Sequence, residues 1–207
     1  MGAEARRQID LFLKQKNGTK ADAAHDWRDV EVIGELKESN VNKKGTLLQI
    51  GRYVRDVFSR QPTRRYVHAF TICGRDMECW VFDRSGCYSP GAFNINQEPG
   101  RFIQVIAGYT MMEEEELGLD TFTEQDDDCC FIHIDGANRR ERLRLESEAF
   151  THQRAIVCRG TSCYLTETPE SKGWNYVTKF SWTSNKRRPE ADLLQLARSR
   201  GVKGVAG

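Results

Sequence analysis

The sequence predicts an α+β fold made of two unlike units, and three observations lead to this prediction. In the first half, apolar strand-like runs are interrupted by two stretches with helical spacing. In the second half, short strand-like runs follow one another and a single helical pattern comes near the end. The 207 residues are also enough for one large domain or for two small ones, each with its own core. We therefore expect a mixed sheet with helices over residues 1–118, and an antiparallel sheet with one helix over residues 119–207.

The elements of the first unit follow from the spacing of apolar residues and from turn residues. Ile50, Tyr53 and Val57 recur at helical intervals, which is typical of a helix with one apolar face. Gly74 falls between two apolar runs and predicts a hairpin turn, and Pro99 suits the start of a second helix. These signals predict, in order, strands at 9–13 and 30–37, a helix at 45–60, strands at 66–73 and 77–83, and a helix at 101–112.

The second unit is predicted to be a set of strands that ends in one helix. Pro189 fits the first position of this helix, and Gly201 is a typical residue at the point where a helix stops. The apolar runs before it predict strands at 129–134, 141–150, 154–158, 163–166 and 174–182, with the helix at 189–200.

The overall composition describes a globular protein and excludes several classes. The net charge is +1, so no strong positive field indicates nucleic acid as the default partner. No apolar run reaches the roughly 20 residues of a membrane-spanning helix, and the first 25 residues lack the apolar region of a signal peptide. We expect an intracellular protein, cytoplasmic or nuclear, that has no membrane partner.

The seven cysteines also exclude some kinds of site. No two of them form a C-x-x-C pair, which disfavours zinc ribbons and thioredoxin-type redox sites. We expect reduced thiols instead.

Lys179 and Glu190 form the first candidate site. Strand alternation places Lys179 on the same side as Val177, away from the aromatic residues of its own strand. Glu190 follows a proline and shares a helix face with Leu193 and Ala197. A carboxylate on an apolar helix face requires a cationic partner, and Lys179 is the nearest candidate in the sequence.

A glycine turn precedes this pair. Gly160, Thr161 and Ser162 lie between two strand-like runs, where backbone N–H groups can approach phosphate oxygens. The order of glycine turn, lysine strand and glutamate helix is the order found in the small lobe of a protein kinase.

The residues themselves, and not only their order, support this comparison over nearly the whole chain. The runs AIVCRGTSCYLT and WNYVTKFSWTSNKRRPEADLLQLARSRGVKGVA resemble the start of the kinase region in the fungal-type protein kinase family. WRDVEVIGELKES, RYVHAFTICGRDMECWVFDRSG and EEELGLD resemble the segment that precedes that region. The resemblance implies an ATP site in which Lys179 holds the α- and β-phosphates and Glu190 orients Lys179. It further implies that Gly160, Thr161 and Ser162 cover the phosphates and that the phosphate acceptor is a protein.

Two departures from the kinase pattern change the expected activity. The turn at Gly160 has one glycine where the G-x-G-x-x-G pattern has three. No H-R-D-type catalytic loop and no D-F-G-type metal ligand follows Glu190 within the 207 residues. We therefore expect a truncated, incomplete small lobe, a fragment of a kinase that is inactive by itself.

A second candidate site lies in the first 60 residues. Asp10 opens an apolar run, and Glu35 and Lys37 point to the same side of the next predicted strand. Gln49 and Tyr53 are four residues apart on the following helix, so they share a face.

This set resembles the core of the PD-(D/E)XK nuclease superfamily. The resemblance implies that Asp10 and Glu35 bind Mg²⁺ or Mn²⁺, that Lys37 is the catalytic lysine, and that Gln49 and Tyr53 form the helix motif of some branches. Carboxylate oxygens are suitable ligands for either metal. Nucleic acid would be a partner only under this interpretation.

Three interpretations stay open from the sequence. The first is the kinase fragment just described. The second is a metal-dependent nuclease, and the third is a nucleotide- or protein-binding module without catalysis.

Overall fold

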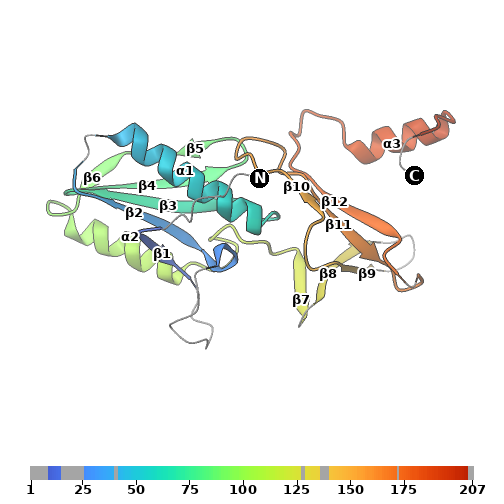
Figure 1. Cartoon of the computed structure of the whole chain (residues 1–207), viewed down its shortest axis with the longest axis horizontal. Helices are drawn as coiled ribbons and strands as arrows, with labels where there is room; N and C mark the ends of the chain where they lie inside the picture. Colours follow the sequence, from blue (N-terminus) through green and yellow to red (C-terminus); the bar gives the residue numbers. More distant parts are fainter. Residues whose placement is uncertain are drawn as a thin grey trace, which may run out of the picture.

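The computed structural model describes residues 9–14, 26–39, 42–126, 129–135, 140–171 and 173–204. Within these residues the protein has two six-stranded sheets and three α-helices (Figure 1). Each sheet uses one continuous stretch of the chain, with the first sheet ending before residue 95 and the second beginning after residue 122. The predicted α+β class is confirmed.

The first sheet is mixed, as expected. Its strands follow the order β1-β2-β3-β4-β5, and β6 pairs with β4. β2 and β3 run parallel, because helix α1 connects them, and the other pairs are antiparallel. The strands are β1 (Leu11–Leu13), β2 (Val32–Lys37), β3 (Tyr66–Cys73), β4 (Asp76–Asp83), β5 (Cys87–Tyr88) and β6 (Ala92–Asn94), and a 3-10 turn, η1 (Trp27–Asp29), precedes β2.

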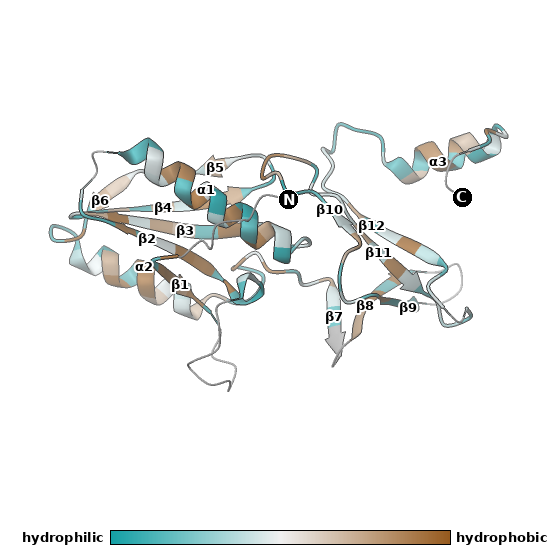
Figure 2. Ribbon diagram, viewed as in Figure 1, coloured by the Kyte–Doolittle hydropathy of each residue, from teal (hydrophilic) through white to brown (hydrophobic). Residues whose placement is uncertain are grey.

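Two helices pack on the first sheet. The Asn42 side chain caps α1 (Lys43–Arg60) by accepting the Gly45 N–H at 3.0 Å, and α1 packs its apolar side against one face of the sheet. The second helix, α2 (Pro99–Met111), begins with Pro99 in its first turn and packs on the other face. Figure 2 shows apolar residues along much of α2.

A buried arginine holds the elements of this layer together. Arg64 is 1% exposed and donates hydrogen bonds to the backbone carbonyls of Val30, Glu31, Tyr66 and Leu117. Burial lowers the pKa of its guanidinium to about 10, so it stays charged at neutral pH. Arg64 therefore fixes the start of β2 and of β3 against the turn that follows α2.

The second sheet is antiparallel, as predicted. Its strands follow the order β10-β11-β9-β8-β7, and β12 pairs with β11. Its buried core is small and consists of Ile132, Leu143, Leu145 and Tyr164. The strands are β7 (Thr123–Asp126), β8 (Cys129–Asp135), β9 (Arg140–Leu145), β10 (Thr151–His152), β11 (Ser162–Glu167) and β12 (Tyr176–Phe180).

The strand predicted at 154–158 is wrong. This stretch crosses to the first sheet, where Ile156 packs against the core beneath α1. The Cys158 N–H donates to the Arg84 carbonyl at 3.2 Å, and Arg84 Nη1 donates to the Ala155 carbonyl at 3.0 Å. These contacts give two backbone groups of the stretch partners outside a sheet.

The last helix, α3 (Glu190–Ser199), differs from its prediction in two ways. Pro189 is its N-cap residue, whereas the sequence predicted Pro189 as the first residue of the helix itself. None of its residues is buried, and Leu193 is 48% exposed, so the apolar face is not enclosed in a core as its spacing predicts. Figure 1 shows α3 standing away from the second sheet.

The seven cysteines are free, as expected. Within the described residues, no helix is long and apolar enough to cross a membrane.

Candidate functional site

The lysine and glutamate predicted as a pair do meet. Lys179 lies on β12, opposite Cys163 of β11, and its Nζ is 2.7 Å from both carboxylate oxygens of Glu190. The Lys179 side chain is 37% exposed and that of Glu190 is 49% exposed. The hydrogen bonds from Lys179 lower the pKa of the Glu190 carboxyl, which therefore stays ionised at neutral pH. The pair is open to solvent and accessible to a ligand.

Two features of the local structure bring the pair together. Alternation along β12 turns Phe180 toward Tyr164 in the small core, which leaves Lys179 on the other side of the sheet. Glu190 occupies the first turn of α3, where a negative side chain also interacts favourably with the helix dipole. The ion pair is thus a direct contact between α3 and β12.

The glycine turn precedes the lysine strand in the chain, but it is packed against other residues and is not open to a ligand. Gly160 is buried with φ +51°, and a Cβ added there would lie 2.7 Å from Arg84 Nε and 3.0 Å from Trp182 Cδ1. Its N–H donates to Cys158 Sγ at 3.2 Å, and the Thr161 N–H donates to Gln153 Oε1 at 3.4 Å. The two N–H groups that could bind phosphate are thus engaged inside the chain.

Ser162 and Thr161 nevertheless lie beside the end of the lysine strand. Ser162 is buried and pairs with Phe180, the neighbour of Lys179. The Thr161 hydroxyl is 3.4 Å from the Ser181 hydroxyl. The pairing of β11 with β12 therefore places the glycine turn next to the strand that carries Lys179.

Sequence reasoning missed Arg84, which fixes the position of this turn. Its guanidinium is stacked over the Phe58 ring at 3.9 Å and contacts the Ala155 carbonyl and Cys158 Sγ. Arg84 follows β4 in a polar turn, a position that ordinarily indicates only an exposed loop residue. The Arg84 side chain thus helps the first sheet to hold the glycine turn that precedes β11.

The predicted acidic cluster of the first sheet also assembles. Asp10 Oδ2 accepts the Leu36 N–H at 3.1 Å and lies 4.0 Å from Lys37 Nζ. Lys37 Nζ donates a short hydrogen bond to Glu35 Oε1. Glu35 and Lys37 project from the same face of β2, the face that α1 covers.

Glu35 is the most unusual residue of this cluster. Its side chain is 0% exposed, and its Oε2 has no hydrogen-bond partner within the described residues. Burial raises the pKa of the Glu35 carboxyl above its usual range, although the contact with Lys37 acts in the opposite direction. The same contact raises the pKa of Lys37.

Gln49 and Tyr53 contact each other, as their spacing predicts. Gln49 Nε2 donates to the Tyr53 hydroxyl at 2.7 Å, and Tyr53 stacks on Trp27 with ring centres 5.9 Å apart. Tyr53 is 4% exposed. Its contacts are those of a core residue that anchors α1.

The cluster offers few ligands for a metal ion. Among the described residues, no group of three His, Cys, Asp or Glu side chains is placed to hold one. Asp10 and Glu35 would supply two carboxylates, and the unpartnered Glu35 Oε2 fits a role as ligand. Water or substrate oxygens would have to complete the six ligands that Mg²⁺ requires.

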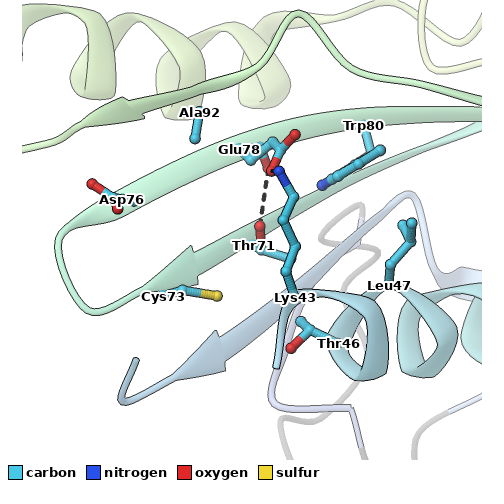
Figure 3. Close-up of a pocket in the computed structure, with 9 residues that line it drawn as sticks. All are labelled: Lys43, Thr46, Leu47, Thr71, Cys73, Asp76, Glu78, Trp80 and Ala92. Carbon is cyan, nitrogen blue, oxygen red and sulfur yellow. Dashed lines mark hydrogen bonds and ion pairs between the residues drawn. The ribbon is translucent and has the colours of Figure 1, made fainter. Parts of the chain in front are cut away.

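A crevice near this cluster is too small to be a site. It holds about 10 Å³ between α1 and the β3–β4 hairpin, roughly the space of one water molecule. Figure 3 shows Lys43 reaching across it to Glu78, where Nζ and Oε2 are 2.8 Å apart. Glu78 also accepts a hydrogen bond from the Ser89 hydroxyl at 2.8 Å. Lys43 and Glu78 therefore stabilise the junction of helix and hairpin.

The fold and the Lys179–Glu190 pair define a class of protein: an α+β protein in which a strand lysine is held by a carboxylate from the first turn of the next helix. Residues 8–207 match the family described as Fungal protein kinase, and the chain belongs to this family. Searches of curated proteins and of solved structures found no match.

Proposed function

We propose that this chain binds ATP through Lys179 and contributes the nucleotide-contacting part of a kinase-like site. Membership of the fungal protein kinase family supports a kinase-like function. The observation that carries the residue assignment is the contact of Lys179 Nζ with both Glu190 oxygens at 2.7 Å. In this proposal Lys179 contacts the α- and β-phosphates and Glu190 fixes its direction.

The chemistry of the pair suits an anionic ligand. A lysine ammonium has three N–H donors, and Glu190 engages two of them, which leaves one for a phosphate oxygen. Because Lys179 is partly exposed, a phosphate can reach it without unfolding of the strand.

The glycine turn must change its contacts before it can take part. For Gly160, Thr161 and Ser162 to cover the phosphates, the Gly160 and Thr161 N–H groups have to leave Cys158 and Gln153. We propose that nucleotide binding drives this exchange of partners.

We expect the 207 residues by themselves to bind ATP without transferring its γ-phosphate. Transfer to a protein hydroxyl requires an aspartate at the acceptor and an aspartate that binds Mg²⁺. No H-R-D or D-F-G motif follows Glu190 in this sequence.

The test is a titration of a fluorescent ATP analogue against the wild type, Lys179→Met and Lys186→Met. Lys186 is an exposed lysine in the loop before α3, so its substitution removes the same charge from the same region. We expect Lys179→Met to weaken binding at least about tenfold, equivalent to about 1.4 kcal/mol. Lys186→Met should bind like the wild type. Equal affinities for all three proteins would contradict the proposal.

A second candidate function, metal-dependent nucleic-acid cleavage, is favoured by one observation. Asp10, Glu35 and Lys37 lie together at the paired ends of β1 and β2. A Mg²⁺ or Mn²⁺ ion held by the two carboxylates would supply an activated water. Lys37 would stabilise the negative charge that develops on the phosphate.

This candidate is tested by cleavage of single- and double-stranded DNA and RNA in Mg²⁺ and in Mn²⁺. Glu35→Ala is compared with Glu38→Ala, which removes an exposed carboxylate three residues further on. Metal-dependent cleavage that is lost only in Glu35→Ala would support a nuclease. The candidate fails if metal produces no cleavage or if the two variants behave alike, and ATP binding alone would then identify a binding module.

A further inference from the structure

A large cavity lies on the face of the first sheet opposite the acidic cluster. It has a volume of about 420 Å³ and lies between α2 and strand β4, with the segment around Pro90 at one side. This volume falls within the roughly 300–1,000 Å³ that is typical of small-molecule sites. Neither of the functions proposed above uses this cavity.

Gly108 keeps the cavity open. It lines the cavity in the third turn of α2, and a Cβ added there would meet nothing within 4 Å. Its backbone is helical, so the conformation does not require glycine. Glycine inside a helix costs about 1 kcal/mol relative to alanine. The chain thus leaves unfilled a space that larger side chains would fill with a gain in stability.

The walls of the cavity are mainly apolar and aromatic. Tyr88, Phe93, Val105, Tyr109 and Met112 contribute to them. Tyr109 is 6% exposed and packs against Phe70 of the sheet with ring centres 6.0 Å apart. An apolar ligand body would be covered on both sides, by the helix and by the strands.

The lining carries positive but no negative formal charge among the described residues. Of the residues that line the cavity within the described ranges, none is Asp or Glu, and Arg101 and Gln104, three residues apart on α2, both face the cavity. His68 also lines it, but its Nε2 is 3.0 Å from the Glu116 carbonyl, and burial lowers its pKa, so it is neutral at pH 7. In the described part of the chain, Arg101 is therefore the one lining residue with a formal charge.

Arg101 has donors available for an anion. Its guanidinium lies over the Phe93 ring at 4.4 Å, and its Nη1 is 3.2 Å from Glu98 Oε2. Because arginine has five N–H donors, this single contact leaves others for a second carboxylate. The Gln104 amide, one turn further along α2, can donate to the same group.

We propose that this cavity is a binding site for a small amphipathic acid, with an apolar body between α2 and β4 and a carboxylate held by Arg101 and Gln104. Gly108 provides the room for the body, and the Phe93 ring positions the Arg101 guanidinium.

The test uses dansyl-undecanoic acid as the probe, with its methyl ester as the control for the carboxylate. The wild type should bind the acid with enhanced dansyl fluorescence and bind the ester more weakly. Gly108→Leu should weaken acid binding at least about tenfold by filling the cavity, without a lower melting temperature. Gly100→Leu is the matched control, because Gly100 lies in the first turn of α2, has open space at its Cβ and does not line the cavity.

Arg101→Met separates the carboxylate contact from the apolar contact. It should weaken binding of the acid about tenfold and leave binding of the ester unchanged. The proposal is overturned if the wild type does not bind the acid, or if Gly108→Leu binds it as the wild type does. If Arg101→Met weakens binding of the acid and of the ester equally, the assignment of Arg101 as the carboxylate site is overturned. If Gly108→Leu does not fold, the comparison of acid and ester in Arg101→Met tests the proposal by itself.

Discussion

The two sheets each carry a lysine–glutamate contact, and the surroundings of the two contacts differ. In the first sheet Lys37 binds Glu35, whose side chain is fully buried beneath α1. In the second sheet Lys179 binds Glu190, and both side chains remain partly in water. The pKa of Glu35 is raised because burial outweighs its partner, whereas the pKa of Glu190 is lowered because its partner outweighs burial.

The degree of burial, rather than the presence of a lysine contact, thus determines whether each pair has a structural role or can bind a ligand. A buried carboxylate has lost its hydration, and one lysine only partly compensates for this loss. An exposed pair contributes little to stability and is screened by salt, but its atoms are free to meet a ligand. The Glu35 pair is therefore mainly structural unless a metal binds, while the Lys179 pair is suited to recognition.

The largest effect is expected from Arg64→Met, which tests how much of the first sheet depends on buried charge. The substitution removes a donor from four backbone carbonyls, of which Val30 keeps a second one, Gln61 Nε2 at 3.0 Å. Each carbonyl left without a partner costs about 1–3 kcal/mol where water cannot reach it. We expect at least about 3 kcal/mol of destabilisation, measured by urea denaturation followed by circular dichroism. Arg52→Met, at an exposed position of α1, is the control and should change little; comparable losses would refute a special role for Arg64.

The next effect concerns Gly160→Ala, where the two sheets meet. The new methyl group would clash with Arg84 and Trp182. The alanine would also have to adopt the left-handed backbone conformation of Gly160, which strains any residue with a Cβ. We expect a loss of about 1–3 kcal/mol, with faster amide exchange at Cys158 and Trp182, whose N–H groups donate to Arg84 and Arg159.

Gly201→Ala is the control for this substitution. Gly201 also has a positive φ, at +66°, but its Cβ would meet nothing within 4 Å. It should show only the backbone strain. If Gly201→Ala costs as much as Gly160→Ala, the packing of Gly160 against Arg84 has no energetic weight.

A smaller effect, of opposite sign for the two glutamates, is expected in the pH dependence of stability. Above the ordinary pKa of 4.5, folded Glu35 keeps its proton longer than unfolded Glu35, so stability falls as pH rises toward the raised value. For Glu190 the shift is downward, so its contribution is present above 4.5 and is lost as pH falls through the lowered value.

Urea midpoints measured between about pH 3 and pH 7 can separate these contributions. Glu35→Gln should be more stable relative to the wild type as pH rises, whereas the deficit of Glu190→Gln, already small at neutral pH, should only shrink as pH falls. The same sign for both variants would contradict the contrast between the buried and the exposed carboxylate.

The smallest effect is expected for Glu190→Gln at neutral pH. Because the pair is exposed, the change in stability should be close to the error of a denaturation experiment and should vanish in high salt. A large, salt-independent loss would show that α3 depends on this contact more than its exposure suggests.

Local patterns predicted most of the elements. Helical spacing from Ile50 to Phe58 predicted α1, and the turn at Gly74 predicted the β3–β4 hairpin. Alternation correctly indicated that Glu35 and Lys37 share a face. These features depend on neighbours within a few residues, which is the range over which sequence periodicity carries information.

The errors arose where distant contacts decide the structure. The stretch 154–158 has the composition of a strand, yet Arg84, some 70 residues earlier, gives its backbone other partners. The leucines of α3 have the spacing of a packed helix, but none of the residues of α3 is buried. The cavity at Gly108 had no signal in the sequence, because an empty space is formed by residues from several elements. The domain boundary after residue 118 and the roles of the site residues stay predictions.

The most direct test of the central claim, that nucleotide binds at the exposed pair, is a titration of the ¹⁵N-labelled wild-type protein with a non-hydrolysable ATP analogue, followed by NMR. We expect shifts at the amides of Gly160, Thr161, Lys179 and Glu190 and none at Glu35 or Lys37. Shifts confined to β1 and β2, or no shifts at saturating nucleotide, would contradict it.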